Sequence, residues 1–135
     1  LYVADTQNHR VRRLYYDGAS QTIETVVGIG LAGQGGTGVP ASNFQVESPN
    51  FLLIDTFKNL WVSSTRSLSV VASGADDIVR GEDEFLTVYG QPPRQDFPMD
   101  ETQCLNGFVL YTDTQPDDSA LLLDSCSGYV MNLSR

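Results

Sequence analysis

Four polar side chains stand close together near the start of the chain, at Asp5, Asn8, His9 and Arg10. Such a cluster could hold a ligand or a metal ion, and the imidazole could act as a general acid or base. His9 is the single histidine, however, and one histidine does not build a zinc site of the usual kind. The alternative is structural, because Asp5 and Asn8 can cap a tight turn while Arg10 pairs with a carboxylate. We favour the structural interpretation and predict no catalytic residue, metal site or cofactor.

A glycine-rich stretch follows, with the spacing Gly28-x-Gly30-x-x-Gly33 of a dinucleotide-binding fingerprint. That fingerprint needs a helix that begins at the glycines, so that helix N–H groups meet the pyrophosphate. Pro40 and Pro49 come next instead, without a run of helix-forming residues. We therefore interpret the stretch as a loop, and loops often carry binding surfaces. The binding candidates in it are Gly30, Gly33, Gln34, Gly35 and Gly36.

The two cysteines, Cys104 and Cys126, lie at the same end of a predicted hairpin. With strands at 107–112 and 120–124 and a turn near 115–118, residues whose numbers sum to about 230 face each other. Both cysteines meet this condition, which favours a disulfide worth about 2–4 kcal/mol of stability. Two unrelated buried thiols are the alternative. A disulfide indicates an oxidising compartment, so we expect an extracellular or cell-surface protein.

Two weaker signals concern the surface. Asn132-Leu133-Ser134 is a glycosylation sequon on a predicted outermost strand, which makes Asn132 a candidate glycosylation site in a secreted protein. Acidic residues also gather in predicted loops, at 76–77, 82–84, 96, 100–101 and 117–118. Several carboxylates could bind calcium, but none of these groups has the EF-hand spacing. We interpret them as a solvated acidic surface.

The element that positions these residues is a strand–turn–strand pattern that occurs three times, beginning at Leu1, Leu60 and Ala120. The three copies begin about 60 residues apart, and such a regular spacing indicates a repeat architecture. Short apolar strands alternate with Gly- and Pro-rich turns, and no segment has helical periodicity. We therefore predict an all-β fold of four-stranded antiparallel meanders without substantial helix. The apolar runs 51–54 and 121–123 favour sheets buried on both faces, as in β-propeller blades.

The predicted strands divide the chain into four parts. Residues 1–20 form the last two strands of a blade, 21–73 a full blade, 74–84 an acidic connector, and 85–135 a second, divergent blade. About two and a half blades cannot close a ring, and open sheet edges are normally covered. Other blades of the same protein, or neighbouring subunits of an assembly, are therefore expected as partners.

Three stretches resemble the NHL-repeat β-propeller family. They are the strand–turn–strand of residues 1–12, the glycine loop from Thr25 to Ala41, and Ser48-Pro49 before the next strand. The resemblance covers residues 1–71, whereas the divergent blade lacks the glycine loop and the Asn-His-Arg turn. Propellers of this family usually have about six blades around a central channel, which the resemblance implies for the whole protein.

The negative net charge of the chain argues against some classes of function. The formal net charge is −9, with four acidic and three basic side chains in residues 1–50 but thirteen and five in residues 51–135. This acidity disfavours nucleic acid, including the RNA bound by cytoplasmic members of the NHL family. No apolar run approaches the roughly 18 residues of a membrane span, so membrane insertion is not expected.

These observations predict a non-catalytic NHL-type propeller segment of a larger secreted or cell-surface protein. It would act in contact with protein ligands or as a structural scaffold in an extracellular assembly. The alternative is part of a metal-dependent propeller enzyme, a lyase or lactonase-like hydrolase, whose metal ligands lie outside this chain.

Overall fold

The computed structural model describes residues 1–33, 38–55, 57–65, 67–90, 108–111, 120–124 and 130–133. Within these ranges the chain forms eleven β-strands and two 3₁₀ helices of three residues each. Every strand pairing is antiparallel, and none of the described helices is long and apolar enough to cross a membrane. The predicted all-β fold without substantial helix is confirmed.

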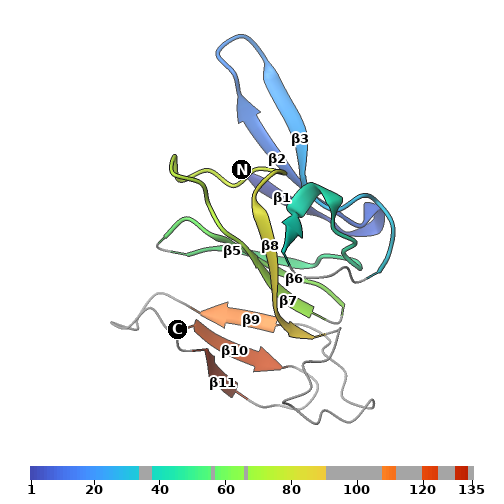
Figure 1. The fold of residues 1–135 in the computed structure, drawn as a ribbon, viewed down its shortest axis with the longest axis vertical. Helices are drawn as coiled ribbons and strands as arrows, with labels where there is room; N and C mark the ends of the chain where they lie inside the picture. The colour runs from blue at the N-terminus through green and yellow to red at the C-terminus, as the bar shows by residue number, and fades with distance from the viewer. Residues whose placement is uncertain are drawn as a thin grey trace.

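Three sheets follow one another along the chain (Figure 1). The first sheet, in the order β1-β2-β3, contains β1 (Tyr2–Asp5), β2 (Arg10–Tyr16) and β3 (Gln21–Val27). The second, in the order β4-β8-β7-β6-β5, contains β4 (Val39–Pro40), β5 (Phe51–Ile54), β6 (Leu60–Ser63), β7 (Ser67–Val71) and β8 (Glu84–Gly90). The third, in the order β11-β10-β9, contains β9 (Phe108–Tyr111), β10 (Ala120–Asp124) and β11 (Val130–Leu133). The 3₁₀ helices are η1 (Thr6–Asn8) and η2 (Ala41–Asn43).

The sheet boundaries differ from those expected at residues 20 and 85. A tight turn folds β3 back onto β2, because the Asp17 carboxylate accepts the backbone N–H groups of Ala19 at 2.9 Å and Ser20 at 2.8 Å. These hydrogen bonds also hold the pKa of the exposed Asp17 carboxyl below its usual value. In the same way β8 pairs with β7. Both strands therefore close the sheet that precedes them, instead of opening the next one as the ranges 21–73 and 85–135 implied.

The hydrophobic core lies between the first two sheets. Strand register places Ile54, Leu60, Val71 and Phe85 in one row across the second sheet. The core joins residues of the first sheet, the second sheet and two segments between strands. These segments are the linker from β3 to β5 (residues 28–50) and the connector before β8. Its buried members are Val11, Val26, Val27, Ala41, Phe44, Val46, Leu60, Val62, Val71, Val79 and Phe85. Since full burial of one such Val, Leu or Phe side chain contributes about 1.5–3 kcal/mol, this shared core ties the two sheets together.

The second sheet is also buried on its other face, at Ser63 and Leu68. In Figure 1 it stands between the first and third sheets. The edge strands β1, β5 and β9 neighbour one another in that order. The described sheets therefore form a stack in chain order, and this stack does not close on itself.

Candidate functional site

The polar cluster of Asp5, Asn8, His9 and Arg10 lies at the turn between β1 and β2. The 3₁₀ helix η1 forms this turn. Asn8 Nδ2 donates a hydrogen bond to Asp5 Oδ1 at 2.7 Å, and Arg12 Nε contacts Asp5 Oδ2 at 3.3 Å. Asp5 makes no side-chain bond to the helix backbone, so it holds the turn through these two side chains. Asp5 therefore does not make the predicted cap; it pairs with Asn8 through the side chains instead.

Arg10 does not make the carboxylate pair that the sequence analysis assigned to it. Its guanidinium donates instead to the backbone carbonyl of Ile29 at 2.9 Å. The neighbouring strand residue Arg12 takes the carboxylate of Asp5 and also donates to Thr25 Oγ1 at 2.8 Å. The reason is register: Arg12 lies opposite Thr25 on β3, whereas Arg10 lies at the start of β2, next to the linker.

Two further side chains of the turn reach the far end of the same linker. Thr6 Oγ1 donates to the carbonyl of Pro49 at 2.7 Å, and His9 Nδ1 accepts the backbone N–H of Ser48 at 3.1 Å. An Nδ1 that accepts a hydrogen bond carries no proton, so it is engaged by the backbone in this structure. The turn thus binds both the beginning and the end of the segment that joins the first two sheets. We call Thr6, His9 and Arg10 the linker clasp.

The glycine loop packs against this clasp. A Cβ at Gly28 would lie 2.4 Å from the carbonyl oxygen of His9, and a Cβ at Gly30 would lie 2.5 Å from the Arg10 guanidinium. The N–H groups of Gly28 and Ile29 donate to carbonyls of the linker and are unavailable to a phosphate. These glycines therefore permit a close approach of two segments, which explains the fingerprint-like spacing without a nucleotide.

Of the remaining binding candidates in the glycine loop, the structure describes only Gly33. Gly33 adopts a φ of 157°, and a Cβ there would lie 2.5 Å from the side-chain oxygen of Gln45. Gln34, Gly35 and Gly36 lie outside the described residues. Between the described glycines, Ile29 and Leu31 expose apolar side chains to solvent.

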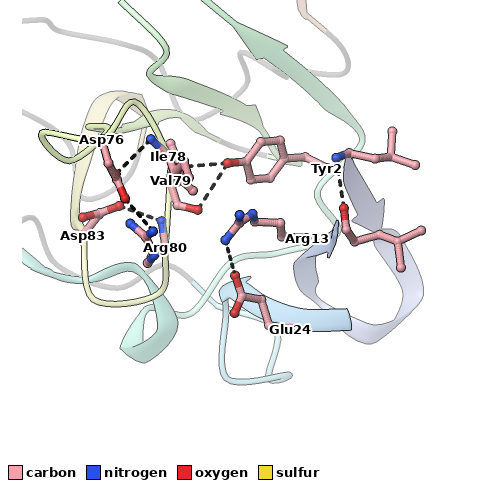
Figure 2. A network of polar contacts seen from close by, with 10 residues as sticks. Tyr2, Arg13, Glu24, Asp76, Ile78, Val79, Arg80 and Asp83 are labelled. Carbon is pink, nitrogen blue, oxygen red and sulfur yellow. Dashed lines mark hydrogen bonds and ion pairs between the residues drawn. The ribbon is translucent and has the colours of Figure 1, made fainter. Parts of the chain in front are cut away.

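The acidic connector before β8 is internally bonded (Figure 2). Asp76 forms an ion pair with Arg80, which lowers the pKa of this carboxyl and raises that of the guanidinium. Asp83 Oδ2 accepts the backbone N–H of Arg80 at 2.6 Å. Among the described residues, no three His, Cys, Asp or Glu side chains gather as a metal site requires. These two carboxylates therefore shape the connector.

Tyr2 attaches this connector to the first sheet. Its hydroxyl accepts the N–H of Val79 at 3.1 Å and donates to the carbonyl of the same residue at 3.2 Å (Figure 2). The backbone of η2 adds two bonds, from Ala41 N to Asp83 O and from Ser42 N to Gly81 O, both at 2.8 Å. The connector thus completes the contact between the first two sheets.

Three buried hydroxyls were missed by the sequence analysis. Ser63, Ser69 and Thr87 each bury a hydroxyl oxygen that finds no hydrogen-bond partner among the described residues. Ser69 and Thr87 lie opposite each other on β7 and β8. The only signal in the sequence is the presence of Ser and Thr at alternate positions of otherwise apolar strands. In the first sheet the corresponding pair, Arg12 and Thr25, is hydrogen-bonded.

The predicted disulfide and glycosylation site involve the third repeat. Cys104 and Cys126 lie outside the described residues, so their pairing stays a prediction. β9 and β10 do pair as an antiparallel hairpin, from Tyr111 opposite Leu121 to Phe108 opposite Asp124, so facing residues sum to 232 (111 + 121) and not to the 230 on which the disulfide prediction was based. Asn132 lies on β11, one of the two edge strands of the third sheet.

Comparison of the chain with protein-family models gives no match, and comparison with curated proteins gives none either. The similarity to NHL repeats therefore rests on the quoted motifs alone. Chemically, the polar cluster engages its groups with one another and with the linker. Its geometry is suited to holding two sheets in a fixed relation.

Proposed function

We propose that the chain is a non-catalytic segment of an NHL-type β-propeller within a larger secreted or cell-surface protein, where it acts in protein–protein contact or as a scaffold. The stacking of the sheets carries this proposal. The second sheet is buried on both faces, and the edge strands β1, β5 and β9 lie in sequence order beside one another. Propellers stack antiparallel sheets face to face in this manner, with one edge strand of each sheet toward a central channel.

The linker clasp supports a non-catalytic role. Thr6, His9 and Arg10 each engage a backbone group of the linker, at 2.7, 3.1 and 2.9 Å. A general base needs a nitrogen that can take a proton from a substrate, and His9 Nδ1 already accepts one hydrogen bond. The chemistry of the cluster is therefore directed at the chain itself.

The loop that follows β3 is the contact surface that the geometry favours. Ile29 exposes 39% and Leu31 exposes 58% of its surface. The backbone beneath them is fixed, because Ile29 N donates to Phe44 O at 3.0 Å and Ile29 O accepts from Arg10. Apolar side chains displayed on a fixed backbone lose little conformational entropy on binding, which favours a protein ligand.

This surface can be tested by affinity isolation. The full-length protein that contains the chain is tagged, isolated from its own source, and its co-purifying proteins are identified by mass spectrometry. We expect Ile29→Asp and Leu31→Asp to lose a protein that the wild type retains. Ile54→Asp is the matched control, because Ile54 is also 39% exposed but lies at the end of β5. The same proteins at the same yield with Ile29→Asp and wild type would refute the proposed contact.

The proposed secretion of the protein through an oxidising compartment is tested by the state of its two cysteines. Peptide mapping of the secreted protein without reduction should recover Cys104 and Cys126 in one linked species. Two free thiols in protein taken from the medium would contradict an oxidising route through the secretory pathway.

A further inference from the structure

The end of the linker forms a four-residue segment, residues 47–50, that is bonded to both of the first two sheets. We call residues 47–50 the corner. Its two outer residues are bonded to the second sheet. Glu47 O accepts the backbone N–H of Thr65, which lies in the turn between β6 and β7, at 3.0 Å. Asn50 N donates to the carbonyl of Ser63, the last residue of β6, also at 3.0 Å.

The two inner residues of the corner are bonded to the first sheet. Ser48 N donates to His9 Nδ1 at 3.1 Å, and Pro49 O accepts from Thr6 Oγ1 at 2.7 Å. Both of these side chains belong to the turn between β1 and β2 and to the linker clasp. The corner therefore binds this turn to the second sheet through four hydrogen bonds, two on each side.

Ser48 has a strained backbone. Its φ is 47° and that of His9 is 52°, so both partners of this hydrogen bond are left-handed, which is unfavourable for a residue with a Cβ. Ser48 also stands directly before Pro49, a position that favours extended backbone. Such a conformation persists only where the surrounding contacts hold it. The bonds from His9 and Thr6 therefore oppose a relaxation of Ser48 toward extended backbone.

One of the four bonds depends on the charge of its acceptor. The other three are accepted by backbone carbonyls, which do not titrate. The acceptor of the fourth is His9 Nδ1, which requires a neutral imidazole with its proton on Nε2. Protonation places an N–H on Nδ1 as well, and this donor then faces the N–H of Ser48. Imidazole side chains change charge between about pH 5 and 8, so this bond is sensitive to pH in that range.

We propose that His9 makes the linker clasp pH-sensitive. The neutral imidazole holds Ser48 in its left-handed conformation, and the imidazolium releases it. The bond is therefore present at the upper end of the histidine range and is lost as the pH falls. The corner stays attached to the second sheet through Glu47 and Asn50, and the hydrophobic core stays intact, so the opening is local. The proposal rests on these contacts and not on the function proposed above.

The charged groups around His9 have other partners or none. In its own turn Asp5 is bonded to two side chains of the first sheet, and Arg10 donates to a backbone carbonyl. Glu47 is the charged residue of the corner, and none of the described carboxylates forms an ion pair with His9. The glycine loop packs against His9, and residues 28–33 carry no charge. Loss of the Ser48 bond is therefore not offset by an existing ion pair.

Nuclear magnetic resonance of the purified chain tests this proposal, because His9 is the single histidine and its ring signals are unambiguous. The ring nitrogens should show the Nε2–H form at about pH 8. The protection of the Ser48 amide is its exchange rate relative to an unstructured chain at the same pH. It should fall roughly two- to tenfold from about pH 8 to about pH 5, the equivalent of one lost hydrogen bond. The Asn50 amide should keep its protection, and equal protection of Ser48 at both pH values would overturn the proposal.

Two variants separate the titration of His9 from the rest of the clasp. His9→Asn introduces an amide that tolerates the left-handed conformation and does not titrate, so the protection of Ser48 should no longer depend on pH. Thr6→Val removes the bond to Pro49 O and should lower the protection of Ser48 at both pH values while its pH dependence remains. If His9→Asn kept the wild-type pH dependence, another group would control the corner and the proposal would be wrong.

Discussion

Gly28 is the residue at which the linker passes the turn between β1 and β2. It adopts a φ of 97°, and an added Cβ would meet the carbonyl oxygen of His9 at 2.4 Å. We expect Gly28→Ala to lower the free energy of unfolding by about 2–4 kcal/mol, because it adds a backbone clash to an unfavourable φ. Urea denaturation measures the loss.

Gly18→Ala is the control for this prediction. Gly18 adopts a similar φ of 93°, but an added Cβ would meet no described atom within 4 Å. Its loss should be only about 1–2 kcal/mol, the cost of the left-handed conformation. Equal losses in the two variants would show that the contact with His9 is unimportant.

A second prediction concerns the unpartnered hydroxyl of Thr87. Thr87→Val keeps the shape of the side chain and removes a buried polar atom that has no partner among the described residues. We expect the free energy of unfolding to rise by about 1 kcal/mol. Thr25→Val, at the equivalent position of the first sheet, removes a hydroxyl that accepts a bond from Arg12 at 2.8 Å and should lower stability. The idea fails if both variants change stability in the same direction.

At the residue scale, the sequence predicted a structural role for the polar side chains of the first turn. It did not predict correctly which groups these side chains contact. Asp5 and Asn8 favour a turn because their short polar side chains can hydrogen-bond to nearby backbone groups. The sequence does not decide whether Arg10 or Arg12 pairs with Asp5, because both lie within reach along β2. Only the three-dimensional path of the linker brings the carbonyl of Ile29 to Arg10.

At the element scale, one side chain of β1, Tyr2, contributes two of the hydrogen bonds that attach the connector before β8 to the first sheet. Tyr2→Phe removes both hydrogen bonds to the backbone of Val79, which leaves a part-buried N–H and C=O without that partner. We expect a loss of about 1–3 kcal/mol in the free energy of unfolding and faster amide exchange in the connector. Tyr16→Phe is the control, since Tyr16 is exposed at the end of β2. Unchanged exchange at Val79 would contradict this role.

Strand positions and the partners within each hairpin were predicted well from apolar runs and turn residues, but the partners of residues 22–27 and 85–90 were not. Periodicity shows that 22–27 and 85–90 are extended, yet it does not say which neighbour they pair with. The hydrogen bonds of the Asp17 turn decide this for β3. β4 was not expected, because two residues, Val39 and Pro40, are too few to show a period.

At the scale of the whole molecule, the repeat of the strand–turn–strand pattern predicted stacked sheets with two buried faces. It did not predict how the sheets are joined. That information lies in Phe44, Val46 and Val79, which come from irregular segments and complete the core between two sheets. Residues without secondary-structure periodicity give no pattern from which such contacts can be inferred.

The shared core makes the first two sheets one cooperative unit, which Phe85 can test. Phe85 is fully buried on β8, and its ring centroid lies 3.8 Å from that of Phe44 in the linker. Phe85→Ala should cost about 3–5 kcal/mol through lost burial and the cavity left behind. Because each 1.4 kcal/mol is about tenfold, the slowest amides of β2 and β7 should exchange roughly a hundredfold faster or more, by a similar factor in both strands.

Ile54→Ala provides the comparison, because Ile54 lies in the same cross-strand row as Phe85 but is partly exposed. It should accelerate both strands much less, since an exposed side chain loses little burial when it is shortened. Native-state hydrogen exchange resolves the two strands separately. If Phe85→Ala accelerated β7 alone and left β2 protected, the sheets would unfold independently, and the core between them would not be what holds the stack together.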